Sequence, residues 1–141
     1  MISYVTIGSN DIPRSKRFFA AFLPALGYQF SEGADGLSYT YPVPDGLPLQ
    51  PDFYVKPPFN GQSATNGNGA MVAFEASSQA EVRRLHAAAC EAGGTDDGAP
   101  GFRPDYGASF FVGYLRDPDG NKIALFSSNP NDPSRDDPPA A

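Results

Sequence analysis

The sequence predicts an α+β domain built from two βαβββ modules, and two observations lead to this fold class. First, each half orders a strand, a helix and further strands. Second, landmarks recur in the same order along both halves. A constant shift takes Tyr4 to Met71, Asp11 to Ser78 and Gly27 to Gly94, and a slightly longer one takes Asp45-Gly46 to Asp119-Gly120.

The first module is expected over about residues 1–57. Alternating β-branched residues predict a strand at 2–7. Asn10 or Asp11 is a suitable helix cap, because either side chain accepts a hydrogen bond from the first turn. Phenylalanine and leucine residues then follow at helical spacing, and Gly27 closes the helix. Further strands are predicted at 28–31, 37–41 and 52–56, with a loop at 57–69.

The second module is expected over about residues 70–128. A strand at 70–75 precedes Ser78 and Glu81, whose spacing is that of a capping box. The helix that they begin ends at Gly93-Gly94. The remaining elements are a loop at 95–107, strands at 109–115 and 122–127, and a tight turn at 117–121. Residues 1–128 would thus form one domain, followed by a flexible Pro- and Asp-rich tail at 129–141.

Composition excludes several classes of partner. The net charge of −6 would repel a phosphate backbone, so we expect no nucleic-acid partner. No apolar stretch approaches the length of a membrane span, so we expect no membrane partner. The single cysteine, Cys90, has no internal disulfide partner and fits a reducing compartment. These features predict a cytoplasmic protein.

Several segments resemble the vicinal oxygen chelate superfamily, which includes glyoxalase I, bleomycin-resistance proteins and extradiol dioxygenases. They are SYVTIGSNDIPRSKRFF at 3–19, GNGAMVAF at 67–74, LHAAACEAGGTDDGAP at 85–100 and YLRDPDGNKIALF at 114–126. The resemblance implies that the strands of both modules form a curved, cup-shaped mixed sheet with helices on the outside. It also implies a homodimer, because members of the superfamily often pair two chains to complete their cups.

The same resemblance assigns metal ligands to four strand positions. Here they are occupied by Tyr4, Tyr54, Met71 and Ala124. Zinc, nickel and iron sites need several His, Cys or carboxylate ligands, and this chain has one His and one Cys. We therefore expect no metal and no cofactor; an all-carboxylate magnesium or calcium site is the alternative.

Strand alternation selects the side chains that would line the cup. Tyr4 brings Thr6 to the cup side, Tyr54 brings Asp52 and Lys56, and Ala124 brings Lys122 and Phe126. From 109–115, either Phe111 or the set of Phe110, Val112 and Tyr114 faces inward. The loop at 95–107 would cover the mouth, where Arg103 either pairs with an anionic ligand or is an exposed loop residue. The candidate ligand-binding residues are Tyr4, Thr6, Tyr54, Lys56, Met71, Arg103, Tyr106, Phe111, Ala124 and Phe126.

These residues predict a metal-independent protein that binds a small molecule in an aromatic-lined cup. One alternative, given by the resemblance, is a lactoylglutathione lyase-type or other lyase- or dioxygenase-like enzyme. Another is a structural or interaction module whose cup is filled. His86 and Cys90 share a helix face, and we expect them to pack rather than to form a nucleophilic pair.

Overall fold

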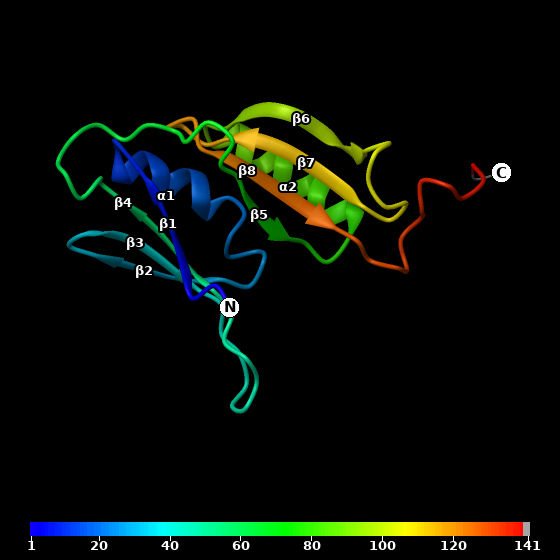
Figure 1. Ribbon diagram of the computed structural model, residues 1–141, viewed down its shortest axis with the longest axis horizontal. Coiled ribbons are helices and arrows are strands. Elements are labelled where there is room, and N and C mark those ends of the chain that lie inside the picture. Colours follow the sequence, from blue (N-terminus) through cyan, green and yellow to red (C-terminus); the bar gives the residue numbers. More distant parts are fainter. Residues whose placement is uncertain (140–141) are drawn as a thin grey trace.

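The computed structural model describes residues 1–139, which form two modules of the same construction (Figure 1). Each module contains one helix and a mixed sheet of four strands. The first module comprises β1 (Tyr4–Gly8), α1 (Ile12–Ala20), β2 (Gln29–Gly33), β3 (Gly36–Thr40) and β4 (Asp52–Lys56). The second comprises β5 (Val72–Glu75), α2 (Gln79–Glu91), β6 (Thr95–Phe102), β7 (Phe111–Arg116) and β8 (Lys122–Ser127).

The strand order confirms the predicted duplication. The first sheet has the order β1-β4-β3-β2 and the second has β5-β8-β7-β6. In each sheet the first strand of the module pairs parallel with the last strand, and the remaining pairs are antiparallel. β1 and β5 are therefore edge strands, each with a free side.

Equivalent residues also play equivalent local roles. Asp11 accepts a hydrogen bond from Arg14 N and caps α1, and Ser78 accepts one from Glu81 N and caps α2. Glu81 bonds the backbone N–H of Ser77 rather than that of Ser78, so the capping box is displaced by one residue. Gly46 and Gly120 both have positive φ angles, 84° and 87°, in matching turns.

One core joins the two modules. Phe74 of β5 packs edge-on against Phe53 of β4, with 5.1 Å between ring centroids, and against Phe22, which follows α1, at 5.9 Å. Phe18 of α1 and Leu115 of β7 are also fully buried in this cluster. Each helix covers one face of its sheet: α1 packs on β3 and β4, and α2 packs on β6, β7 and β8. We call the opposite face of each sheet its open face.

The largest error of the sequence prediction concerns residues 95–107. The segment was expected to be a loop, but its first part, Thr95–Phe102, forms β6. Its sequence, TDDGAPGF, lacks the apolar alternation that predicts a strand. β6 is an edge strand with register shifts between Asp96 and Gly98 and between Gly98 and Gly101. An irregular edge strand tolerates polar, Gly and Pro residues that an interior strand would exclude.

The segment after β8 lies against the second module. Asp132 accepts a hydrogen bond from Gln79 N at the start of α2, with 2.7 Å between the two atoms. Arg135 Nη1 donates to three backbone carbonyls, those of Arg103, Pro104 and Tyr106. The flexibility expected of 129–141 stays a prediction, and residues 140 and 141 lie outside the described residues. No helix within 1–139 is long and apolar enough to cross a membrane.

Candidate functional site

The open face of the first sheet carries two neighbouring aromatic rings, the exposed Tyr4 and the half-buried Tyr54. Phe53 and Val55 of β4 point into the core and are almost fully buried, so the alternate residues of the strand face outward. Tyr54 lies on this open face beside Tyr4 of β1, with 5.7 Å between ring centroids. Tyr4 is 63% exposed. In β1, Tyr4 and Thr6 are exposed, whereas Val5 and Ile7 pack against the core.

On this open face, polar contacts fix the Tyr54 hydroxyl and the Lys56 ammonium. The Tyr54 hydroxyl donates a hydrogen bond to Asp52 Oδ2 at 3.0 Å, and this bond raises the pKa of Tyr54. Lys56 Nζ lies 2.6 Å from Asp35 Oδ2 and 5.1 Å from the centre of the Tyr54 ring. The Lys56 ammonium holds the pKa of Asp35 below its usual value. Tyr54 therefore stays a neutral hydrogen-bonding group, and the charge of Lys56 is already paired.

A cavity of about 520 Å³ lies where β1 and β4 end, and neither Tyr4 nor Tyr54 lines it. Thr6 and Lys56 form its sheet side, and the Pro-rich loop after β4 forms the rest. Phe59, in that loop, is fully exposed. A volume of this size is within the range of small-molecule sites.

On the second sheet, the structure resolves which residues of β7 face outward. Phe111 is 1% exposed and packs in the core against Phe102, with the Arg83 guanidinium over its ring. Phe111 therefore offers no surface to a ligand, unlike the expectation that placed it in the cup. Val112 and Tyr114 alternate with it and face the open side. Phe110 contacts Phe126 on that side, with 4.7 Å between ring centroids.

The middle of this second open face is filled. Ala124 and Val112 are each 1% exposed although neither belongs to the core cluster. In the β7–β8 register, Tyr114 lies directly opposite Ala124. Neighbouring side chains therefore cover Ala124, and access to this face is from its ends. Met71, immediately before β5, is 48% exposed.

Basic residues gather around Tyr114 at one end of this face. Arg103 and Lys122 both lie over its ring, at 5.2 and 4.9 Å from the centroid. Arg116 faces Lys122 across the β7–β8 ladder. We define the basic cavity as the hollow of about 390 Å³ whose lining includes Met71, Tyr106, Tyr114, Arg116 and Lys122.

Strand alternation placed Lys122 on the cup side, but sequence reasoning named neither Lys122 nor Arg116 as a ligand-binding residue. A usable signal was present in the tight turn at 117–121, which joins their strands. Because a tight turn fixes the register of its hairpin, the residues flanking it must face each other.

Side chains at the four positions assigned to metal ligands do not fit a His- and carboxylate-based centre. Ala124 has no donor atom, and the thioether of Met71 is a poor ligand for zinc or nickel. Tyr54 would have to lose a proton that its bond to Asp52 holds in place. Within residues 1–139, no group of three or more His, Cys, Asp or Glu residues is arranged to hold an ion.

His86 and Cys90 lie on the helix side of the second sheet. His86 is 7% exposed, and its Nε2 donates to the Tyr114 carbonyl at 2.9 Å. Cys90 Sγ is 3.9 Å from His86 Nδ1, and burial raises the pKa of the thiol. A raised pKa disfavours the thiolate, so this pair has the character of packing residues.

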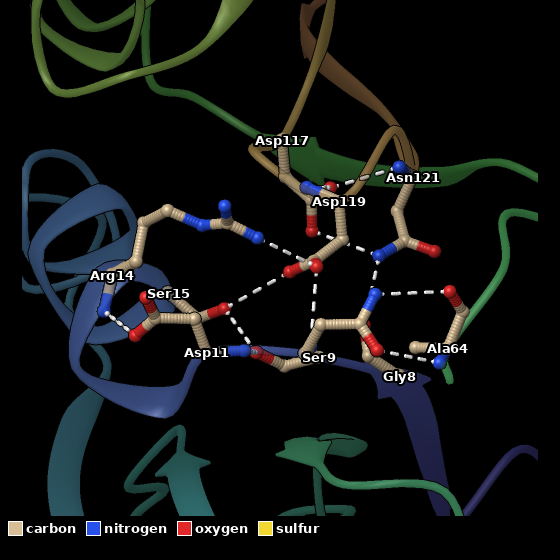
Figure 2. A network of polar contacts seen from close by, with 10 residues as sticks. Gly8, Ser9, Asp11, Arg14, Ser15, Ala64, Asp117, Asp119 and Asn121 are labelled. Atoms are coloured by element: carbon tan, nitrogen blue, oxygen red, sulfur yellow. Dashed lines mark hydrogen bonds and ion pairs between the residues drawn. The ribbon is translucent and has the colours of Figure 1, made fainter. Parts of the chain in front are cut away.

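A polar junction fixes the two modules relative to each other (Figure 2). The Asp119 side chain is 2% exposed and accepts hydrogen bonds from Arg14 Nη2 at 2.8 Å and from the Asn10 backbone at 3.1 Å. Asn121 Nδ2 donates to the Gly8 carbonyl and to Asp117 Oδ2. Burial raises the pKa of Asp117, which organises the turn through its bonds to Asn121. The β7–β8 turn is thereby bound to the β1–α1 junction.

The two edge strands meet at a groove of about 420 Å³. Val5 of β1 and Phe74 of β5 both line it, together with Ile2 and Met71. Ile2 is 64% exposed. Its lining also includes Tyr28 and Phe53, and it shares Met71 with the basic cavity.

Comparison with known proteins agrees with this architecture. The crystal structure of a glyoxalase/bleomycin resistance protein from Albidiferax ferrireducens T118 is similar, with a TM-score of 0.74 and 38% identity over 90% of this chain and 98% of that one. A glyoxalase-related enzyme from Fulvimarina pelagi has a TM-score of 0.66 and 20% identity, over 90% and 87% of the respective chains. A hypothetical protein, SA1046 from S. aureus, has a TM-score of 0.66 and 20% identity, over 90% of this chain and 94% of that one.

No curated protein matches the chain. The family profile described as Glyoxalase/Bleomycin resistance protein/Dioxygenase superfamily matches residues 1–125, which include both modules. Together with the repeated strand order, this match shows that the chain belongs to the glyoxalase/bleomycin resistance protein/dioxygenase superfamily.

Proposed function

We propose that the protein binds a small organic molecule on the open faces of its sheets without a metal ion. The observation that carries the proposal is the aromatic pair of the exposed Tyr4 and the half-buried Tyr54, at positions where the resemblance expects metal ligands. Aromatic rings that reach the surface are typical of ligand-binding sites. The Tyr54 hydroxyl is hydrogen-bonded to Asp52, so Tyr54 would offer a ligand its ring and a polar edge of fixed orientation.

The candidate ligand-binding residues of the two sheets would contribute to the site in different ways. Tyr4, Thr6, Tyr54 and Lys56 would contact the ligand from the first sheet. Met71, Tyr106 and Phe126 would do so from the second, with Arg103 supporting the ring of Tyr114. Ala124 would lie beneath the covering side chains, because it is 1% exposed.

A second function, that of a filled structural module, has support only on the second sheet. There Ala124 and Val112 are covered on the open side. On the first sheet the 63% exposure of Tyr4 favours an open site instead. An enzyme of the lactoylglutathione lyase type is less well supported, since that chemistry needs a Lewis acid and the four positions lack suitable donors.

We also propose that a second copy of the chain completes the cup. The free edges of β1 and β5 and the exposed Ile2, Tyr4 and Met71 around them support a homodimer. Light scattering coupled to size-exclusion chromatography should give twice the 15.0 kDa chain mass. A monomer at all accessible concentrations would contradict this part of the proposal. The cytoplasmic location belongs to the same proposal and rests on the single free thiol, Cys90.

The proposal is tested with N-phenyl-1-naphthylamine, a neutral aromatic probe whose fluorescence rises in apolar surroundings. In EDTA the purified protein should bind the probe, and elemental analysis should find no stoichiometric metal. Tyr4→Ala should weaken binding about five- to tenfold, because an aromatic contact contributes about 0.5–1.5 kcal/mol beyond its buried area.

Leu49→Ala is the matched control, because Leu49 is 76% exposed and does not line the cavities described above. It should leave probe binding unchanged. Zinc, nickel or iron at one per chain, or binding that requires one of them, would contradict the proposal. Equal binding by Tyr4→Ala and the unmodified protein would remove the first sheet from the site.

A further inference from the structure

The basic cavity concentrates positive charge on a protein whose net charge is −6. Arg103, Arg116 and Lys122 surround Tyr114, and Asp97 is their one carboxylate partner within 4 Å in residues 1–139. Asp97 Oδ2 lies 3.0 Å from Arg116 Nε and 3.3 Å from Lys122 Nζ. Arg103 does not line the cavity itself, so its two lining cations against one carboxylate leave an excess of one positive charge there.

This excess of positive charge is unfavourable for the stability of the sheet. Arg116 and Lys122 are direct cross-strand partners, and like charges in such positions repel each other. The register of β6 shifts between Asp96 and Gly98, and Asp97 is the residue at this irregularity. Bulges often re-aim a side chain, and here the carboxylate reaches both cations. A single carboxylate bridges the pair but does not neutralise it.

The backbone also makes room for the stacked ring. Gly98 has a φ of 150°, and a Cβ there would lie 2.9 Å from the Tyr114 ring and 3.2 Å from Arg103 Nη2. A side chain at this position would push Tyr114 and Arg103 out of contact. Gly98 therefore permits the close stacking of Arg103 on Tyr114, whose ring lines the basic cavity.

Hydrogen-bond donors remain available beside this wall. Arg116 uses Nε for Asp97 and Nη1 for the Gly120 carbonyl, which leaves Nη2 without a protein acceptor in the described residues. Nη2 is not among the buried unpaired atoms, so it is open to solvent. The Lys122 ammonium has three donors, of which Asp97 takes one. The Lys122 side chain is 30% exposed, and that of Arg116 is 34% exposed.

We infer that the basic cavity binds an organic anion with a flat aromatic or conjugated body. Its carboxylate or sulfonate group would lie on Arg116 and Lys122, and its body would lie against Tyr114, Tyr106 and Met71. The inference rests on the proposed function, and it names the chemical class of the ligand. A simple inorganic anion would leave the two tyrosines and Met71 unused, whereas a neutral aromatic would leave the donors unpaired.

Two matched fluorescent probes test the inference. 8-Anilinonaphthalene-1-sulfonate carries the same aromatic body as N-phenyl-1-naphthylamine and adds one sulfonate. We expect the sulfonate probe to bind at least tenfold more tightly than the neutral one at low salt. Arg116→Gln and Lys122→Gln should each remove about tenfold of that preference, as expected for one charge-assisted contact. Neither variant should change the affinity for the neutral probe.

Arg84→Gln is the matched control, because Arg84 is a surface arginine on α2 that pairs only with Glu81 in the described residues. It should leave both affinities unchanged, and circular dichroism melting curves should show that all variants fold. Equal affinity for the two probes, or a preference that survives both cavity substitutions, would overturn the inference while the proposed function stands. Failure of both probes to bind would overturn both proposals.

Discussion

The open faces of the two sheets have the same strand order but present different surfaces. On the first sheet Tyr4 is exposed beside the half-buried Tyr54, and the nearby cation, Lys56, is paired with Asp35. On the second sheet the middle is filled over Ala124, and unbalanced cations surround Tyr114 at one end. Duplication has thus preserved the backbone while the outward side chains have diverged.

The difference teaches which positions the fold constrains. Inward residues such as Val55 and Leu125 are apolar and fully buried in both modules, because they must fill the shared core. Outward residues at matched places are free to specialise. The first open face is mainly aromatic, and the second adds the basic cavity at one end.

The largest effect on stability is expected from removing a side chain that packs in the core shared by both modules. Phe74→Ala should lower the free energy of unfolding by about 3–5 kcal/mol, because it leaves a cavity between Phe53 of one module and the β5 strand of the other. Chemical denaturation measures this loss. Phe59→Ala, at a fully exposed position, should change the same quantity by less than about 0.5 kcal/mol. Comparable losses in the two variants would refute a shared core.

A smaller effect is expected from the junction between the modules. Asp119→Ala should cost about 2–3 kcal/mol of unfolding free energy, since Arg14 and the Asn10 backbone lose a buried acceptor. Asp45→Ala changes the equivalent turn residue of the first module, which is exposed, and should cost almost nothing. If both substitutions had the same effect in urea denaturation, the junction would not hold the modules together.

Enlarging small side chains should sharpen the contrast between a filled and an open face. Ala124→Leu should destabilise the protein by about 1–3 kcal/mol, because its surroundings are already packed. Thr6→Leu adds bulk at an exposed position of the first sheet and should stay within about 0.5 kcal/mol. Thermal melting curves of the two variants make the comparison, and an unchanged melting temperature for Ala124→Leu would show that the second face has space.

The smallest predicted effect depends on pH. The pKa of Tyr54 is raised by its hydrogen bond to Asp52, so this bond contributes to stability below the ordinary tyrosine pKa of about 10. That contribution is lost as the pH rises through the folded-state pKa. Ultraviolet titration near 295 nm should show one tyrosine ionising at lower pH in Asp52→Asn than in the unmodified protein. An identical titration curve would mean that Asp52 does not hold the Tyr54 proton.

Much of the fold was predictable because the helices have clear caps and the strands have clear alternation. Asp11, Ser78 and the matching turns carry local conformational preferences that act without tertiary context. β6 was missed because backbone pairing with β7, rather than side-chain burial, holds its polar Asp96 and Asp97 in a strand. The facing of β7 stayed open because Phe110, Phe111 and Val112 are all apolar and show no alternation.

The candidate site was predictable only in part for the same reason. Tyr4, Thr6, Tyr54 and Lys56 follow from alternation within single strands. The cluster of Arg103, Arg116 and Lys122 depends on the β7–β8 register and on the irregularity in β6, which are properties of paired strands. Composition gave no indication of it, since the chain as a whole is acidic.

The central claim is that ligand binding on these open faces needs no metal ion. Its most direct test is an amide proton–nitrogen NMR titration of the protein with N-phenyl-1-naphthylamine in EDTA. The account predicts chemical-shift changes at Tyr4, Tyr54 and Met71, and the same changes when Zn²⁺ replaces EDTA. Changes that arise only after a divalent metal is added, or that are confined to residues remote from both open faces, would contradict it.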